Sequence, residues 1–176
     1  AVNKTDLANG DEITEIYEKA GYKAIKVCAE KNEGMEGLKD LICGKVTAFA
    51  GNSGVGKSSL LNRLGFECET GSVSKIERGK HTTRHTELMP LGNSGYVIDT
   101  PGFSLLEIDD IKHDELKNYF IEFSKFDDCR FSGCLHMGAK PSDCGVCAAV
   151  KNKDIHETRY NSYINLYNSI KELKEW

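Results

Sequence analysis

The sequence predicts an α/β domain built around a phosphate-binding loop, followed by a small helical domain that a metal ion holds together. Two observations carry this prediction. A short apolar run at 46–50 precedes a glycine-rich loop and a helical stretch at 59–64. Further along, four cysteines and one histidine gather between residues 129 and 147. We therefore expect a nucleotide-binding domain over 1–110 and a metal-binding helical domain over 111–176.

Composition bounds the class of protein. A chain of 176 residues can form one core and a small appendage. Its net charge of −4 argues against a strongly nucleic-acid-binding surface over the chain as a whole. No apolar run reaches membrane-spanning length and no signal peptide precedes the first motif, so we expect a cytoplasmic monomer without a membrane partner. Seven cysteines, four of them clustered, favour a metal site over a disulfide scaffold.

The glycine-rich loop fits the pattern of Gly, four residues, then Gly-Lys-Ser. Strand, complete motif and helix occur together, which favours an anion-binding nest over a plain turn. We expect Lys57 to reach the β- and γ-phosphates and to assist catalysis, and the Ser58 hydroxyl to ligate Mg²⁺. The predicted nucleotide contacts are Gly51, Asn52, Ser53, Gly54, Val55, Gly56, Lys57, Ser58 and Ser59.

Near the start of the chain, Asn3-Lys4-Thr5-Asp6 fits the guanine-specificity signature Asn-Lys-x-Asp of GTPases. A carboxylate at Asp6 can accept hydrogen bonds from the N1–H and the exocyclic amine of guanine, a donor pair that adenine lacks. Asn3 is expected to contact the base edge and to brace the phosphate loop. The stem of Lys4 is expected to lie on the base plane.

A second base-recognition loop is predicted at Cys28-Ala29-Glu30, after a helix at 11–20 and a strand at 22–27. GTPases carry a Ser-Ala-Lys-like loop at this point. The backbone N–H of Ala29 can contact the guanine oxygen without any side chain, although a plain strand-to-helix loop is the alternative. A short helix is expected at 37–42, ahead of the phosphate loop.

Two further segments predict the γ-phosphate and magnesium contacts. Residues 65–79 resemble a mobile loop, and a threonine just beyond it, Thr82 or Thr83, would join the Mg²⁺ shell. We favour Thr83, and a basic patch facing RNA is a compatible alternative. An edge strand at 87–91 and a hairpin turn lead to a buried strand at 96–98.

That buried strand ends in Asp99-Thr100-Pro101-Gly102. Asp99 is placed to hold Mg²⁺ through water, and the Gly102 N–H to contact the γ-phosphate. Phe103 follows where Ras-like enzymes place a glutamine that orients water, and an apolar side chain cannot do this. Catalysis then needs another group, for which His81 is our candidate, or a group from a partner.

The second half is expected to be helical, with an aromatic core stripe after residue 111 and a long helix over 155–176. Cys129, Cys134, His136 and Cys144 supply three thiolates and one imidazole, the ligand set of a structural Zn²⁺ site. Cys147 competes with Cys144 as the fourth ligand. We prefer Cys144, because Cys147 is placed to start the next helix.

The motifs stand in an unusual order, since Asn-Lys-x-Asp precedes the phosphate loop. Such a circular permutation can work because every motif lies at the carboxyl edge of one parallel sheet. In this order and in its motifs the chain resembles the RsgA family of circularly permuted GTPases. The residues that carry the resemblance are Asn3–Asp6, Gly51–Ser59, Gly79–Thr83, Asp99–Phe103 and the metal cluster, where the spacing before Cys144 is two residues longer than the family pattern.

The resemblance implies binding of GTP and GDP with Mg²⁺, GTP hydrolysis stimulated by the small ribosomal subunit, contact with its rRNA, and a role in late maturation of the 30S subunit. It also implies that the N-terminal OB-fold domain of the family and the first strands of its GTPase domain are absent from this sequence. Two rival functions remain open: a guanine-nucleotide switch with negligible turnover, and a zinc-stapled RNA-binding module with a vestigial nucleotide site.

Overall fold

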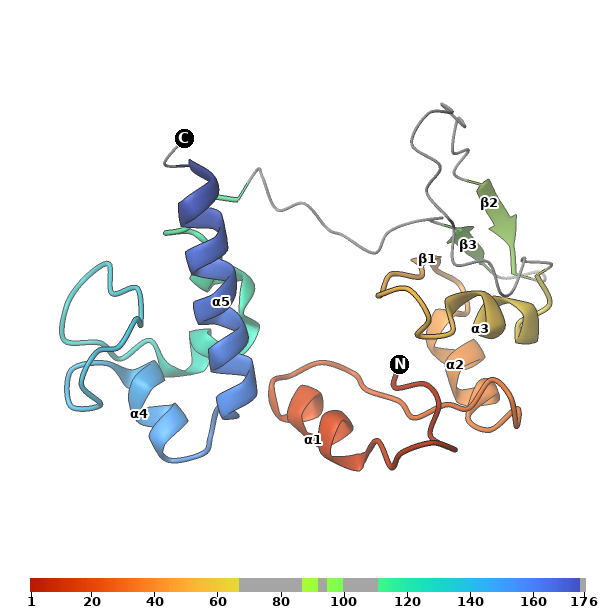
Figure 1. Cartoon of the computed structure of the whole chain (residues 1–176), viewed down its shortest axis with the longest axis horizontal. Coiled ribbons are helices and arrows are strands. Elements are labelled where there is room, and N and C mark those ends of the chain that lie inside the picture. The colour runs from red at the N-terminus through yellow and green to blue at the C-terminus, as the bar shows by residue number, and fades with distance from the viewer. Residues whose placement is uncertain (67–86, 92–94, 100–110, 175–176) are drawn as a thin grey trace. The chain divides into compact units, whose positions relative to one another are not determined.

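The computed structural model describes residues 1–66, 87–91, 95–99 and 111–174. These residues form two compact units (Figure 1). The first contains the described parts of 1–14 and 24–106, and the second contains 15–23 and the described parts of 107–176. Among the described residues, no helix has the length and apolar character that crossing a membrane requires.

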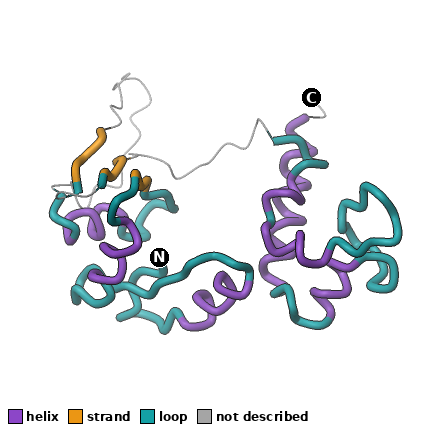
Figure 2. The backbone as a smooth tube through the Cα atoms, turned by 180° about the vertical axis from the view of Figure 1, so that it is seen from behind, coloured by secondary structure: helices purple, strands orange, loops and turns teal. Residues whose placement is uncertain are grey.

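The first unit contains a mixed three-stranded sheet, and Figure 2 shows that the strands of the described chain lie together there. The order is β1 (Val46–Ala48), β3 (Tyr96–Asp99), β2 (Glu87–Pro90), with β1 parallel and β2 antiparallel to β3. Val97 of the central strand is fully buried. The strands predicted at 46–50, 87–91 and 96–98 are therefore present with slightly different ends, but within 96–98 only Val97 is buried, and Tyr96 is exposed.

The strand predicted at 22–27 is wrong in extent. Only an isolated parallel bridge forms, between Val2 and Lys26. Val2 donates its N–H to the Ile25 carbonyl and accepts from the Val27 N–H. The backbone then leaves the extended conformation at Lys4, whose φ is 65°, and Thr5 donates its N–H to the Val27 carbonyl at 3.4 Å, so the regular ladder ends after one rung.

Two helices cover the core of the first unit. Helix α2 (Met35–Ile42) buries Met35, Leu38 and Ile42, which recur at helical spacing, and α3 (Lys57–Arg63) buries Leu60 and Leu61. Both begin two residues before their predicted starts. Gly34 permits the entry into α2, because its φ is 71° and a Cβ at this position would collide with the Lys26 carbonyl oxygen.

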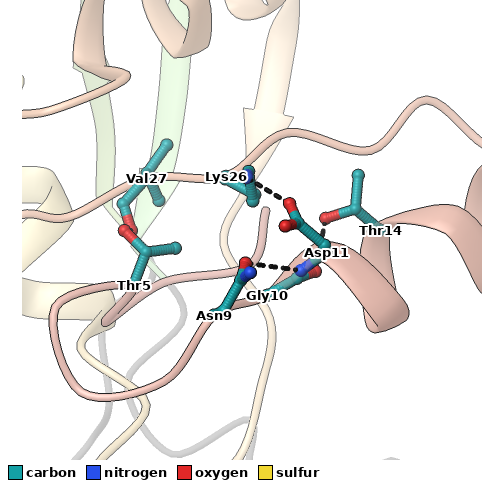
Figure 3. Close-up of polar contacts among 7 residues, drawn as sticks. All are labelled: Thr5, Asn9, Gly10, Asp11, Thr14, Lys26 and Val27. Atoms are coloured by element: carbon teal, nitrogen blue, oxygen red, sulfur yellow. Dashed lines mark hydrogen bonds and ion pairs between the residues drawn. The ribbon is translucent and has the colours of Figure 1, made fainter.

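Helix α1 (Asp11–Lys19) agrees with its prediction and begins in a small polar network (Figure 3). The Asn9 side chain accepts from the Asp11 N–H at 3.1 Å, which satisfies one of the free donors at the helix start. Lys26 forms an ion pair with Asp11. The hydroxyl of Thr14 donates to the Gly10 carbonyl at 2.8 Å. The network fixes the start of α1 to the segment that carries Val27.

The second unit packs two short 3₁₀ helices, η1 (Leu116–Tyr119) and η2 (Ile121–Phe126), against α4 (Gly145–Lys151) and α5 (Glu157–Lys174). The α-helical pattern predicted after residue 111 is therefore wrong in type. Phe120 separates the two 3₁₀ pieces with an extended ψ of 88°. The aromatic stripe still forms core, since Phe120 and Phe123 are buried against Tyr163, but Tyr119 is exposed.

Residues 15–23 join this second unit through Arg159 of α5. The guanidinium lies over the rings of Tyr17, Tyr22 and Phe120 at 5.2, 5.5 and 4.8 Å. Its Nε donates to Glu122 Oε1 at 2.7 Å, and both side chains of this ion pair are largely buried. Replacing only one residue of a buried ion pair destabilises the fold, because the remaining charge is left buried and unpaired.

Candidate functional site

The phosphate loop follows β1 and leads into α3. Gly51, Gly54 and Gly56 have φ values of 151°, 79° and 94°, a left-handed conformation that favours glycine. The ammonium of Lys57 lies inside the loop and donates to the carbonyls of Gly51 at 2.6 Å and Asn52 at 2.9 Å. The loop thus presents a cation at the N-terminus of a helix, an arrangement suited to phosphate.

The Asn3–Asp6 loop is held directly against the phosphate loop. Asn3 Nδ2 donates to the Val55 carbonyl at 3.0 Å, and Lys4 Nζ donates to the Gly54 carbonyl at 2.7 Å. A side chain at Gly56 would collide with Asn3 Nδ2, so the close approach of the two loops requires a glycine there. The structure therefore brings together two motifs that lie about fifty residues apart in the sequence, as the 52-residue separation of Asn3 and Val55 shows.

Asp6 lies beside Cys28. The Cys28 thiol donates to Asp6 Oδ1 at 3.2 Å and lowers the pKa of that carboxyl, so Asp6 is ionised at neutral pH. The Ala29 N–H donates to Asn3 Oδ1 at 3.2 Å. Thr5 turns its hydroxyl to the Val27 carbonyl at 3.2 Å. The carboxylate predicted to read guanine and the second base loop are thus neighbours, while the contact between Ala29 and guanine stays a prediction.

Sequence reasoning missed Arg63, the last residue of α3. Its Nε donates to the Ala29 carbonyl at 2.6 Å and its Nη2 to the Glu30 carbonyl at 3.0 Å. An arginine at an exposed helix position carries no distinguishing signal in a single sequence. Only the fold reveals that this side chain holds the second base loop.

A cavity of about 630 Å³ adjoins the phosphate loop. Polar groups of Asn3, Lys4, Ser53 and Lys57 line it, together with apolar side chains that include Phe49. Asp6 and Cys28 are not among its lining residues. The cavity therefore borders the residues predicted to bind phosphate, but it does not extend to Asp6, which is predicted to recognise guanine.

The structure describes only some of the residues that are predicted to contact magnesium and the γ-phosphate. β3 is parallel to β1 and ends at Asp99, so its backbone ends beside the start of the phosphate loop. Ser58 lies in the first turn of α3. His81, Thr82, Thr83, Gly102 and Phe103 lie outside the described residues, and their predicted roles stay predictions.

In the second unit, Cys129, Cys134, His136 and Cys144 converge, with one ligand atom from each lying within 4.8 Å of the others. The Sγ atoms of Cys129 and Cys144 are 3.8 Å apart, and His136 Nδ1 lies 3.5 and 3.3 Å from them. Zn–S bonds of 2.3 Å in a tetrahedron give edges of about 3.8 Å between sulfurs and about 3.5 Å between sulfur and nitrogen. The cluster fits zinc, with Nδ1 as the histidine ligand.

The protonation states suit metal binding. Burial, with the nearby Lys117 cation, lowers the pKa of His136, so its imidazole is neutral at neutral pH. Burial raises the pKa of the Cys144 thiol to about 11. A divalent cation would lower that pKa, because coordination stabilises the thiolate, and zinc binding would therefore release protons.

The structure separates the two candidates for the fourth ligand. Cys144 caps α4, and its Sγ accepts from the Cys147 N–H at 3.4 Å while facing His136. Cys147 lies in the first turn of α4, and its thiol lies 3.6 Å from both the His136 carbonyl and the Tyr160 hydroxyl. Cys147 therefore stands behind the cluster rather than in it.

Two tyrosines of α5 hold the loop that carries His136. Tyr160 donates to the His136 carbonyl and Tyr163 to the Leu135 carbonyl, both at 2.6 Å. His136 has a left-handed φ of 56°, a conformation that is uncommon for residues other than glycine. The hydroxyls therefore stabilise the backbone conformation that aims the imidazole at the three sulfurs.

Replacing Tyr160 or Tyr163 with phenylalanine is expected to weaken zinc affinity by about tenfold or more, as loss of groups that orient metal ligands does elsewhere. Competition with a chromogenic zinc chelator would measure this. Tyr167→Phe is the matched control, since Tyr167 is a buried tyrosine of the same helix whose ring packs on Tyr163 and His113. Equal losses in all three variants would contradict a specific role for the two hydroxyls.

Comparisons with known proteins agree with these features. A family model described as RsgA GTPase matches residues 1–109. Proteins named small ribosomal subunit biogenesis GTPase RsgA from Alkaliphilus metalliredigens and Caldanaerobacter subterraneus are each 47% identical to this chain, covering 99% and 97% of it. The chain spans 62% and 59% of the length of these two relatives.

Two solved structures are similar as well. The crystal structure of YjeQ from Thermotoga maritima matches with a TM-score of 0.73 and 39% identity, over 96% of this chain and 58% of that one. The crystal structure of YloQ, described as a circularly permuted GTPase, matches with a TM-score of 0.73 and 34% identity, over 98% of this chain and 56% of that one.

Proposed function

This chain belongs to the RsgA GTPase family, and from that premise we propose that it binds GTP and GDP with Mg²⁺, hydrolyses GTP, and acts in the biogenesis of the small ribosomal subunit. The family and the circularly permuted GTPase fold expected from the sequence are confirmed by the family match and by the similar structures. The activity and partners of the full-length relatives come to this chain as a proposal, since it spans about three fifths of their length.

One observation supports guanine-nucleotide binding most directly. Asn3 joins three segments, because its amide donates to Val55 in the phosphate loop and accepts from the N–H of Ala29. The ionised Asp6 stands next to this junction through Cys28. A nucleotide reaches from a base at one end to phosphates at the other, and these contacts hold the two ends of such a site together.

Each part of the site takes a distinct role in this proposal. Lys57 and the N–H groups of the phosphate loop bind the phosphates, and Asp6 selects guanine over adenine. Ser58 and Thr83, with Asp99 through water, hold the Mg²⁺ that neutralises charge developing on the phosphates. His81 positions or deprotonates the attacking water, and Gly102 contacts the γ-phosphate.

The zinc cluster and the partners complete the proposal. Cys129, Cys134, His136 and Cys144 hold a structural Zn²⁺ that stabilises the second unit. Because Phe103 cannot orient water, the small ribosomal subunit or its rRNA is expected to complete the catalytic arrangement. We further propose that the protein works as a monomer in the cytoplasm, where small subunits mature.

Small ribosomal subunits are expected to raise GTP turnover by this chain by about 1,000-fold or more, the scale of effect seen when a partner completes a GTPase site. Phosphate release would be measured with small subunits, with large subunits as the control, and with a Lys57→Ala variant. Slow turnover that small subunits leave unchanged would place subunit recognition outside this chain. Nucleotide binding without any turnover would favour the switch, and no guanine binding would overturn the proposal.

A further inference from the structure

Arg63 ends α3, the helix that starts at the phosphate loop, and reaches across to the second base loop. Its Nε and Nη2 donate to the carbonyls of two successive residues, Ala29 and Glu30. Among the described residues, Arg63 forms no ion pair with a carboxylate. Its charge is therefore directed at backbone oxygens, where a hydrogen bond from an ionised donor is stronger than one between neutral groups.

These two bonds close a ring of contacts around the site. Ala29 donates to Asn3, Asn3 donates to Val55 in the phosphate loop, and that loop continues into α3, which carries Arg63. Helix α3 is fixed in turn, because Leu60 and Leu61 are buried in the core. The ring therefore links the base end of the site to its phosphate end through one rigid helix.

We propose that Arg63 is a positioning residue for guanine recognition: it holds the Ala29–Glu30 backbone at a fixed place relative to the phosphate loop. This inference rests on the proposed guanine-nucleotide site. In this role Arg63 contacts neither the base nor the phosphates. It acts through the loop, whose Ala29 N–H donates to Asn3 and whose neighbour Cys28 donates to Asp6.

The geometry favours arginine over lysine at this position. A guanidinium presents several donors in a fixed plane and can serve two adjacent carbonyls together. A lysine ammonium is a compact group on a flexible stem, and it retains the charge without this fork. Arg63→Lys should therefore retain only part of the GDP affinity that Arg63→Met loses. If the positive charge alone mattered, lysine would retain the full affinity.

The proposal predicts a separation between binding and chemistry. Arg63→Met should weaken GDP binding and raise the KM for GTP by about tenfold, the scale expected for one charge-assisted contact network. The kcat should change far less, because the loop contacts the base equally in the ground state and the transition state. Lys39→Met is the matched control, since Lys39 is an exposed cation on α2 of the same unit without a side-chain partner among the described residues.

A second measurement needs no nucleotide. Hydrogen exchange of the backbone amides of residues 29–31 would be compared in the nucleotide-free chain for wild type, Arg63→Met, Arg63→Lys and Lys39→Met. Faster exchange confined to this loop in Arg63→Met, together with weaker GDP binding, is the expected result. Unfolding of the whole unit would instead raise exchange at buried residues such as Val97 as well.

The outcomes are distinct. GDP binding within twofold of wild type in Arg63→Met overturns the inference, and so does weaker binding with unchanged exchange at residues 29–31. Full recovery by Arg63→Lys overturns it too. If wild type binds no guanine nucleotide, the proposed function fails, and the positioning of residues 29 and 30 by Arg63 is still decided by the exchange rates alone.

Discussion

Replacing Asp6 with asparagine is expected to weaken GTP binding by about a hundredfold or more and to let xanthosine triphosphate bind in its place. The Asp6 carboxylate is ionised and held by Cys28. As an ionised acceptor it would form two charge-assisted hydrogen bonds with guanine, which are stronger than bonds between neutral groups. An asparagine accepts one of them and turns an N–H donor toward the exocyclic amine, whereas xanthine carries a carbonyl oxygen there.

Competition titrations with GTP and xanthosine triphosphate would measure this exchange of specificity. Asp40→Asn is the matched control, because Asp40 is an exposed carboxylate on α2. GTP affinity that stays within twofold of wild type in Asp6→Asn would remove Asp6 from the base site. Loss of GTP binding without any gain for xanthosine triphosphate would indicate that the substitution damages the loop rather than its hydrogen-bonding pattern.

Removing zinc, or replacing Cys144 with serine, is expected to unfold the second unit. A structural zinc site supplies apparent binding energy on the order of 10 kcal/mol at pH 7, and that energy is coupled to folding. The core beside the cluster includes the fully buried ring of Tyr163, which contacts Phe120 and Phe123. The expected signature is loss of the near-ultraviolet circular dichroism of the tyrosines when a chelator is added, and its return when zinc is restored.

Cys147→Ser is the control that separates the two candidate ligands. Cys147 is a buried thiol close to the cluster, yet its Sγ faces the His136 carbonyl and the Tyr160 hydroxyl. This variant should retain one zinc per chain by elemental analysis, whereas Cys144→Ser should lose it. The reverse result would assign the fourth ligand to Cys147 and contradict the arrangement of the cluster described above.

What could be predicted from the sequence was local. The phosphate loop and the Asn3–Asp6 signature each carry their chemistry in contiguous residues, so their types and order alone indicate a role. The preference for Cys144 over Cys147 assumed that the next helix starts at Cys147, whereas α4 starts at Gly145 and has Cys147 in its first turn. The roles of His81 and Thr83 were predicted in the same way and await measurement.

What could not be predicted depends on contacts between distant residues. Tyr160 and Tyr163 lie on the long helix predicted over 155–176, and residue spacing indicates which ring faces the core but not where a hydroxyl points. Arg63 resembled any exposed helix cation. The prediction of a strand at 22–27 was wrong for a related reason. The length of a strand depends on its partner, and here the partner contributes a single residue, Val2, which pairs with Lys26.

The ring that joins Asn3, Ala29, Arg63 and Val55 also bears on how the protein is made. Its contacts span 26, 34 and 52 residues of sequence, so they form late compared with the turns of a helix. During synthesis the base-recognition loops leave the ribosome first and must wait for Arg63 to emerge. In a nascent chain that ends before Arg63, the two base-recognition loops are not yet held together. We therefore expect nucleotide to stabilise the nascent chain only after α3 has been synthesised.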